Sequence, residues 1–388
     1  MSQFLRSRAM LLALLLGRLA AIDETAALIA DAQRWLLAQQ RSDGGIAAPY
    51  FSLGITELAL LAWRTEPQAV PIEDPAVQRA VAFIRAHVQP DGGIYVPREG
   101  LGLYGTGLGI QALRAAKALD SATADRARRF LYGLQDLTSR SPTYGGFTYH
   151  PDASYSSADL HNTMTAIISL RAAGVPAQEP RLRAALHFIS MCQDLSPPSS
   201  DHDPFLAASD LPQPSPAAHR LRSWVRGSGG ATSRPVILHP SDAAEQHADD
   251  SGRHPSVYGS MTYAMLESYL ALELMPDDPR VRAGLDWVER HWTLDRNPGL
   301  PEPDALAGLF YSYTAMSRAL ELAGVGRLRT AEGREIDWRR ELAQALQQRA
   351  QRDQHGVFWC NTHPRWGESL PALVTAYALI SLKRCAGR

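Results

Sequence analysis

A threonine followed by small and aliphatic residues recurs six times along the chain, and this repeat limits the possible folds more than any other feature. The threonines are Thr56, Thr106, Thr163, Thr262, Thr314 and Thr375. Successive threonines are 50, 57, 99, 52 and 61 residues apart. A period of this size is typical of architectures in which each repeat is one supersecondary unit. The sequence therefore predicts six units, with one large insertion in the fourth.

Each unit contains two helical patterns of different character. In the segment before Thr106, the apolar residues Val77, Val81 and Ile84 recur at three- and four-residue spacing. Arg79 and Arg85 lie off that stripe, which predicts a helix with one solvated side. Several such segments begin with proline behind an acidic residue, a common helix start. The threonine segments carry few charges and suit helices buried on both sides. We expect outer and inner helices, respectively.

The pattern as a whole predicts an all-α fold, because neither sustained alternation nor Asn-Gly hairpin turns recur. Six outer-inner pairs can stack as an open superhelix or close into a ring. An open solenoid needs polar capping repeats at its ends. The last threonine segment, "ALVTAYALISL", is as apolar as the others. We therefore expect residues 1–388 to form a single domain, an (α/α)6 double-layered toroid.

The insertion spans residues 194–257 and is rich in Pro, Ser, Asp and Gly. A loop of that length inside a compact domain is usually functional or disordered. It begins where other units make a short turn, so it should lie at the mouth of the ring. We expect it to act as a lid, with Trp224 and Arg226 folding inward.

Composition argues against several classes of protein. Lys and Arg number 39 and Asp and Glu number 40, so the chain has no strong field to attract nucleic acid. Cys192, Cys360 and Cys385 form no CxxC pair, which argues against a disulfide framework and a Cys-rich zinc site.

The first residues, "MSQFLRSRAMLLALLLGRLAA", have the outline of a secretion signal. Arg18 and Leu19 fit that outline poorly, so an amphipathic first helix and a cytoplasmic protein are favoured over export. No other apolar run approaches the roughly 20 residues that cross a bilayer. We expect a soluble protein that at most touches a membrane peripherally.

The turns after the outer segments carry a recognisable pattern in "WLLAQQRSDGGI", "FIRAHVQPDGGIYV", "YGGFTYHPD" and "QRAQRDQHGVFW". An aromatic residue or Leu, a Gln, and then Gly before an apolar residue resembles the repeat of squalene-hopene cyclases and protein prenyltransferase β subunits. "GLFYSYTAMSRALELAG" and "NTHPRWGESLPALVTAYALISL" are similar to bacterial prenyltransferase and squalene oxidase repeat proteins. The resemblance covers about residues 24–385 and implies the toroid. Glycine pairs suit a tight reversal with positive φ, and Gln can bind exposed helix ends.

The resemblance also implies a site at one mouth of the barrel, among residues one to four positions before each threonine. In squalene-hopene cyclases a D-x-D-D motif lies there, and its middle Asp protonates an alkene. On Thr163 the three acidic positions fall on Asp159, His161 and Asn162, so only the first matches. Imidazolium, with a pKa of about 6.5, is a much weaker acid than that step needs. "HADD" at 247–250 lies too far before Thr262 and is expected to be a solvated loop.

Protein prenyltransferases hold zinc through D-x-C and a His that precedes the threonine position of a later helix. Asp159 and His161 fit the first part with His in place of Cys, whereas Met261 occupies the position of the second His. Zinc takes three or four protein ligands, so we predict no metal site. No D-D-x-x-D motif for metal-bound diphosphate is present, and no cofactor is expected.

Asp159, His161 and Asn162 are therefore the candidate catalytic residues, with His161 as acid or base, Asp159 orienting it and Asn162 positioning substrate. They equally suit an N-terminal helix cap, and the sequence leaves both roles open. The candidate substrate-binding residues lie at matching positions in other units or in the loop before the last inner helix. They are Tyr104, Tyr258, Ser260, Tyr311, Tyr313, His363, Trp366 and Glu368.

Aromatic faces can stabilise a carbocation or line a lipid-binding hollow. The sequence thus favours an isoprenoid-handling enzyme that acts on a long apolar substrate in the barrel cavity. The alternative is a non-catalytic toroid that binds a lipid or a peptide.

Overall fold

The computed structural model describes residues 24–153, 157–195, 209–213, 227–235 and 257–387. The expectations for the N-terminal 23 residues, for Trp224 and Arg226 as parts of a lid and for the acidic loop 247–250 fall outside these described residues.

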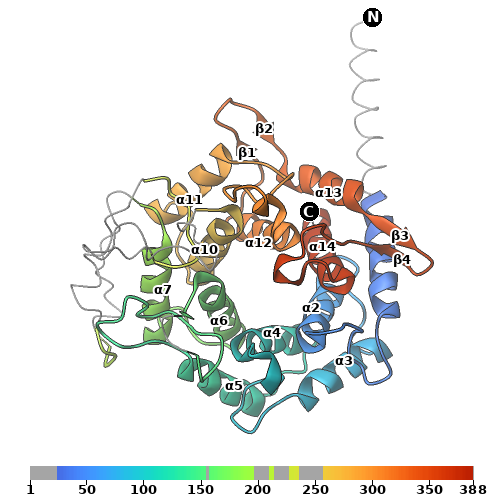
Figure 1. The fold of residues 1–388 in the computed structure, drawn as a ribbon, viewed down its shortest axis with the longest axis horizontal. Helices are drawn as coiled ribbons and strands as arrows, with labels where there is room; N and C mark the ends of the chain where they lie inside the picture. The colour runs from blue at the N-terminus through green and yellow to red at the C-terminus, as the bar shows by residue number, and fades with distance from the viewer. Residues whose placement is uncertain (1–23, 154–156, 196–208, 214–226, 236–256, 388) are drawn as a thin grey trace, which may run out of the picture.

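Six inner helices form a closed ring. They are α2 (Ser52–Arg64), α4 (Gly102–Ala115), α6 (Leu160–Ala172), α10 (Gly259–Ala271), α12 (Leu309–Leu322) and α14 (Pro371–Ala386). Each packs against the next, and α14 packs against α2 (Figure 1). This closure confirms the prediction of a toroid.

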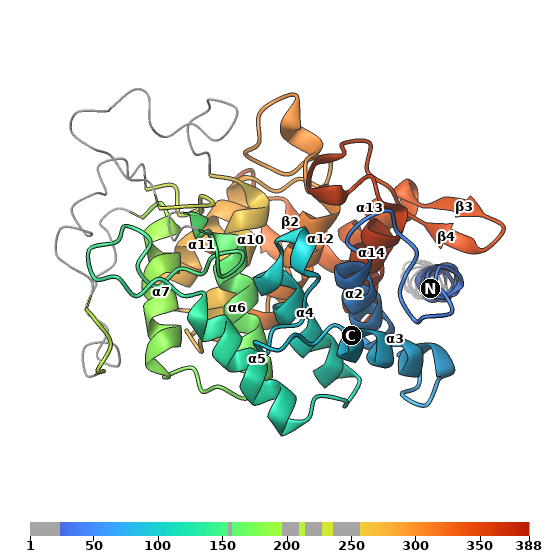
Figure 2. The same ribbon diagram turned by 60° about the horizontal axis from the view of Figure 1, so that its bottom comes forward.

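The outer layer surrounds that ring, as Figures 1 and 2 show from two directions. It consists of a helix that covers residues 24–38, α3 (Pro75–Ala86), α5 (Ser121–Gly133), α7 (Pro180–Cys192), α11 (Pro279–Arg290) and α13 (Trp338–Arg349). Each outer helix precedes its inner partner in the chain. No helix in the described part of the chain is long and apolar enough to cross a membrane.

The outer helices begin where the Pro signals predict. Asp74 caps α3 by accepting the Ala76 N–H at 2.8 Å, and Asp278 caps α11 by accepting the Arg280 N–H at 2.9 Å. A proline follows each cap, where its fixed φ and missing N–H fit the first turn.

Two short hairpins depart from the all-α expectation. β1 (Leu328–Arg329) pairs with β2 (Glu335–Ile336), and β3 (Gln351–Asp353) pairs with β4 (Gly356–Phe358), both antiparallel. With two or three residues each, these strands are too short to show alternation in the sequence. The remaining elements are the 3-10 turns η1 (Pro97–Glu99), η3 (Asp304–Leu306) and η4 (Arg365–Gly367).

The recurring threonine fastens the turn that precedes its own helix. In five units its Oγ1 accepts a backbone N–H from that turn, for example from Phe147 to Thr163 at 3.1 Å. The Thr163 hydroxyl also donates to the Asp159 carbonyl, one helical turn earlier, at 2.7 Å. Thr314 differs, because its hydroxyl lies 3.1 Å from the Tyr377 carbonyl of the next inner helix. The threonine is therefore a structural residue of the repeat.

In five units a turn glycine lets the turn approach the following outer helix. Gly145 has φ 87°, and a Cβ added there would lie 1.9 Å from the Ala184 carbonyl oxygen of α7. Gly356 makes the same approach to Asp31 in the first outer helix, which closes the outer layer. The Gln135 side chain bridges the two parts, because its Nε2 donates to the carbonyls of Gly145 and Arg181. The Gln therefore joins neighbouring units.

Candidate functional site

Four aromatic side chains from four inner helices meet across the axis of the ring. This aromatic layer consists of Tyr104 on α4, His161 on α6, Tyr311 on α12 and Tyr377 on α14. The His161 ring lies 5.3 Å from the Tyr104 ring and 4.7 Å from the Tyr311 ring, measured between centroids. The Tyr104 and Tyr377 hydroxyls are 3.2 Å apart. Helices α6 and α12 are not neighbours in the ring, so these side chains point toward its axis.

Solvent-sized space reaches this inward face of the helices. Tyr104, His161 and Tyr311 are only half-buried, although helices surround them. The residues seven positions later, Gln111, Ile168 and Arg318, are also half-buried, and seven residues are two helical turns along one face. On α2 the matching position is Gly54, where an added Cβ would meet no atom within 4 Å. The α2 side of the ring is therefore open at the level of the aromatic layer.

Asp159 caps helix α6, one of the two roles that the sequence left open. Its Oδ1 accepts the Asn162 N–H at 2.7 Å, and its Oδ2 accepts the Tyr149 hydroxyl at 2.6 Å. Both oxygens are thus occupied, and Asp159 makes no hydrogen bond to His161. Two tyrosine rings hold the imidazole instead of this carboxylate. Tyr149 could not be predicted as a partner of Asp159, because no helical pattern in the sequence places it beside the cap.

The aromatic layer is electrically neutral near pH 7. Burial lowers the pKa of His161, and the nearby Asp159 charge only partly opposes that shift. Burial raises the pKa of Tyr104, Tyr311 and Tyr377. The imidazole is then unprotonated and the phenols keep their protons. His161 is consequently suited to accept a proton rather than to donate one.

Three other candidate substrate-binding residues, Ser260, Tyr313 and Tyr258, are not part of the aromatic layer. Ser260 is tied to Asn297, whose amide nitrogen donates to the Ser260 Oγ at 3.0 Å. The Tyr313 hydroxyl donates to the Leu294 carbonyl, which lies outside the aromatic layer. Tyr258 precedes α10 and is buried, and burial followed by the Asp159 charge raises its pKa. Only Tyr258 of these three lies near the cap of α6.

The three candidates before α14 fasten a loop to the start of α12. The Glu368 carboxylate accepts the Tyr311 N–H at 2.7 Å and the Asn361 amide at 2.6 Å, so it serves as a helix cap. Burial nevertheless raises the pKa of Glu368. His363 Nε2 lies 3.3 Å from Asp304 Oδ1. Trp366 has φ 58°, packs its ring on Gly308 and keeps 51% of its surface exposed. Glu368 thus holds the backbone of Tyr311, a member of the aromatic layer, whereas the contacts of His363 and Trp366 described above do not reach that layer.

The sequence patterns did not identify one buried carboxyl group, that of Glu57 on α2. Glu57 follows Thr56 directly, is fully buried, and has no hydrogen-bond partner for either oxygen among the described residues. Its Oε1 lies beside Gly109 of α4, in space that a larger residue would fill. Burial, and secondarily the Glu99 charge, raise the pKa of Glu57 well above its ordinary value. The sequence feature that could have identified Glu57 is a single acidic residue inside an otherwise apolar inner-helix segment.

Asn162 is a second buried polar side chain at the cap of α6. Its contact with the Tyr149 hydroxyl lowers the pKa of Tyr149, although burial keeps that pKa raised overall. In the described ranges, no three His, Cys or carboxylate side chains gather where one metal ion could bind them.

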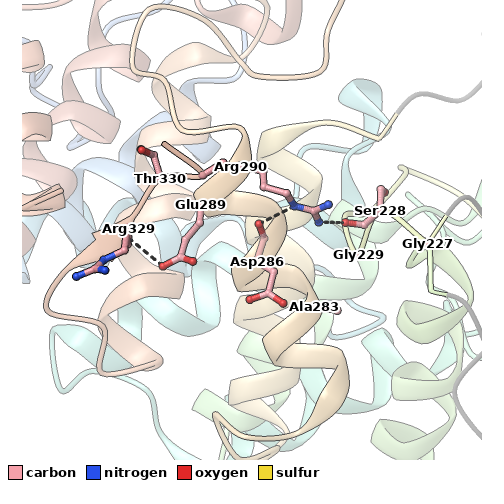
Figure 3. Close-up of a pocket in the computed structure, with 10 residues that line it drawn as sticks. Gly227, Ser228, Gly229, Ala283, Asp286, Glu289, Arg290, Arg329 and Thr330 are labelled. Carbon is pink, nitrogen blue, oxygen red and sulfur yellow. Dashed lines mark hydrogen bonds between the residues drawn. The ribbon is translucent and has the colours of Figure 1, made fainter. Parts of the chain in front are cut away.

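A separate pocket lies on the outside of the toroid, between α11, residues 227–229 and the segment that follows β1 (Figure 3). Its volume is about 560 Å³. Figure 3 shows Arg290 bonded to Ser228 and Arg329 bonded to Glu289 along its wall. No candidate catalytic or substrate-binding residue lines it, so it is not part of the axial site.

The sequence matches no protein-family model and no curated protein. Solved structures do match. The type II terpene cyclase MstE from Scytonema, without ligand, superposes with a TM-score of 0.55 at 15% identity, over 94% of this chain and 99% of that one. A variant of MstE in complex with its product, merosterolic acid A, gives 0.55 at 14% identity over 95% and 99%. The chain has a terpenoid cyclase-like fold. At this identity the likeness concerns the fold, and the chemistry has to be argued from the site.

Proposed function

We propose that this protein is an isoprenoid-handling enzyme that binds a long apolar substrate along the axis of the inner ring. The aromatic layer beside the open space at Gly54 is the observation that carries this proposal. Rings of Tyr104, Tyr311 and Tyr377 present faces that attract a cation and edges that pack against hydrocarbon. MstE, which shares the fold, holds the terpenoid product merosterolic acid A, and this supports a ligand of that class.

The proposed chemistry is proton transfer to a base. Neutral His161 lies against Tyr104 and Tyr311, where an acidic group of a substrate held by those rings would be within reach. Its imidazole would accept that proton, and the electron pair of the broken bond would stay on the substrate. Asp159 serves this step by capping α6 and thereby fixing where His161 projects.

The test uses lipids extracted from the purified full chain and identified by mass spectrometry. We expect an isoprenoid in the extract. Gly54→Phe should fill the open space and reduce the retained isoprenoid at least tenfold, while changing stability by less than about 1 kcal/mol. Gly133→Phe is the matched control, because Gly133 also has no atom within 4 Å of an added Cβ but lies on the outer helix α5. Equal retention in both variants would rule out axial binding.

His161→Ala separates an enzyme from a non-catalytic binder. Loss of turnover of the recovered isoprenoid with binding retained supports the enzyme. If neither turnover nor binding changes, the toroid is a lipid-binding protein and His161 has no chemical role.

A further inference from the structure

A second set of side chains crosses the axis two helical turns beyond the aromatic layer. This polar layer consists of Gln111 on α4, Ser169 on α6, Glu267 on α10 and Arg318 on α12. Gln111 and Arg318 each follow a tyrosine of the aromatic layer by seven residues, so they project from the same faces about 10 Å further along. The polar layer therefore lies toward the C-terminal ends of the inner helices.

An ion pair and two hydrogen bonds connect the polar layer from one side of the ring to the other. Arg318 Nη2 lies 2.7 Å from Glu267 Oε1 and 3.5 Å from Gln111 Oε1. Gln111 Nε2 donates in turn to the Ser169 Oγ at 3.0 Å. Helices α4 and α12 face each other across the ring, since two inner helices separate them in either direction. The polar layer thus forms a floor beneath the aromatic layer.

One polar group between the two layers lacks a partner. The Tyr311 hydroxyl oxygen is enclosed and has no hydrogen-bond partner among the described residues. Burial raises the pKa of Tyr311, and Glu267 and Arg318 influence it in opposite directions, as expected if the hydroxyl points at the floor. An enclosed hydroxyl without a hydrogen bond has lost its water partners without replacement, which is energetically unfavourable. A bound group that supplies the bond would remove this cost.

Arg318 supplies further hydrogen-bond donors at the floor. Its side chain is 22% exposed, whereas that of its partner Glu267 is 2% exposed. A guanidinium has five N–H donors, and the bonds to Glu267 and Gln111 both use Nη2. Arg318 therefore has N–H donors left for a ligand that extends from the aromatic layer to the floor.

The charges of the floor cancel, which limits the net charge that a bound ligand can carry. Arg318 pairs with Glu267, and the nearby Arg384 pairs with Glu321. A diphosphate or a carboxylate would bring further negative charge into a buried layer where both of these arginines are already paired, and an unpaired buried charge is costly. A neutral oxygen atom can accept hydrogen bonds there without that cost.

We infer that the substrate is an isoprenoid with one uncharged oxygen function, such as an alcohol, phenol, ketone or quinone. The oxygen binds Tyr311 and Arg318 at the floor, and the hydrocarbon chain runs through the aromatic layer toward the mouth. This inference rests on the proposed function and specifies the polar end of its substrate.

The experiment compares three C20 probes on the full chain by calorimetry: geranylgeraniol, geranylgeranyl diphosphate and the corresponding hydrocarbon. We expect the alcohol to bind at least tenfold more tightly than the other two. Tyr311→Phe keeps the ring and removes the hydroxyl, so it should weaken alcohol binding about five- to tenfold and leave hydrocarbon binding unchanged. Tyr144→Phe is the control, because that hydroxyl donates to the Pro212 carbonyl outside the ring of inner helices, and both affinities should be unchanged.

Two results would overturn the inference while leaving the proposed function intact. One is tightest binding of the diphosphate, and the other is equal weakening of alcohol and hydrocarbon by Tyr311→Phe. If no probe binds at all, axial isoprenoid binding fails together with the head-group assignment.

Discussion

The turns between outer and inner helices repeat the same contacts in five of the six units, whereas the inner face of the ring varies from helix to helix. Helices α4, α12 and α14 present Tyr, α6 presents His and α2 presents Gly. A threonine hydroxyl accepts a turn N–H in five units, and turn glycines repeatedly meet a carbonyl of the next outer helix. Among the inner helices, by contrast, oxygen atoms of Glu57 and Tyr311 lack hydrogen-bond partners among the described residues. The repeated turn contacts thus stabilise the fold, and the inner helices keep costly groups that stability does not require.

The largest effect is expected at a turn glycine. Gly145→Ala should destabilise the fold by more than about 3 kcal/mol or prevent soluble expression, because its Cβ would lie 1.9 Å from the Ala184 carbonyl oxygen at φ 87°. Thermal and urea unfolding of the purified variant measure this loss.

Gly324→Ala is the control that isolates the close approach. Gly324 also has a positive φ, 66°, but no atom lies within 4 Å of its added Cβ. It should cost only about 1–2 kcal/mol from the backbone conformation. If the two variants are equally stable, the approach between turn and outer helix does not hold the units together.

A smaller loss is expected from the threonine. Thr163→Val removes the acceptor of the buried Phe147 N–H and should cost about 1–3 kcal/mol. Thr314→Val should cost less than about 1 kcal/mol, because Thr314 receives no turn N–H and the Tyr377 carbonyl keeps a bond from the Ser381 hydroxyl at 2.8 Å. Chemical unfolding of both variants compares them, and an equal loss would refute the special role of the five matching threonines.

The same contrast explains how much the sequence could predict. The spacing of the six threonines and the glycine turns predicted the outer and inner helix layers, because the units repeat the same local contacts. The sequence also placed Tyr104, His161 and Tyr311 together, since they precede equivalent threonines. It could not pair Tyr104 with Tyr377, because Tyr377 follows its threonine and the contact joins residues 273 positions apart. Nor could it tell that Glu368 and Ser260 serve helix ends, since those partners come from separate loops.

The smallest effect is expected at the buried carboxyl group on α2. Burial raises the folded-state pKa of Glu57, so the folded protein keeps this proton at pH values where the unfolded chain has lost it. The stability that Glu57 contributes is therefore fully present below about pH 4.5 and is lost progressively as the pH rises toward the folded-state pKa. Glu57→Gln does not titrate, so it should become more stable relative to the wild type between pH 5 and pH 8.

Glu332→Gln gives the opposite sign and serves as the control. A backbone bond within Glu332 and one from Thr330 lower the pKa of this exposed carboxyl, so its contribution is present above about pH 4.5 and lost as the pH falls. Urea unfolding should show a Glu57→Gln difference that grows from pH 5 to pH 8, and a Glu332→Gln difference that stays constant over that range and changes only below about pH 4.5. A Glu57→Gln difference that does not change with pH would mean that Glu57 finds a partner in the folded protein. A gain in stability that is accompanied by lost turnover would instead place this carboxyl in the chemistry, since selection then keeps a group that costs the fold stability.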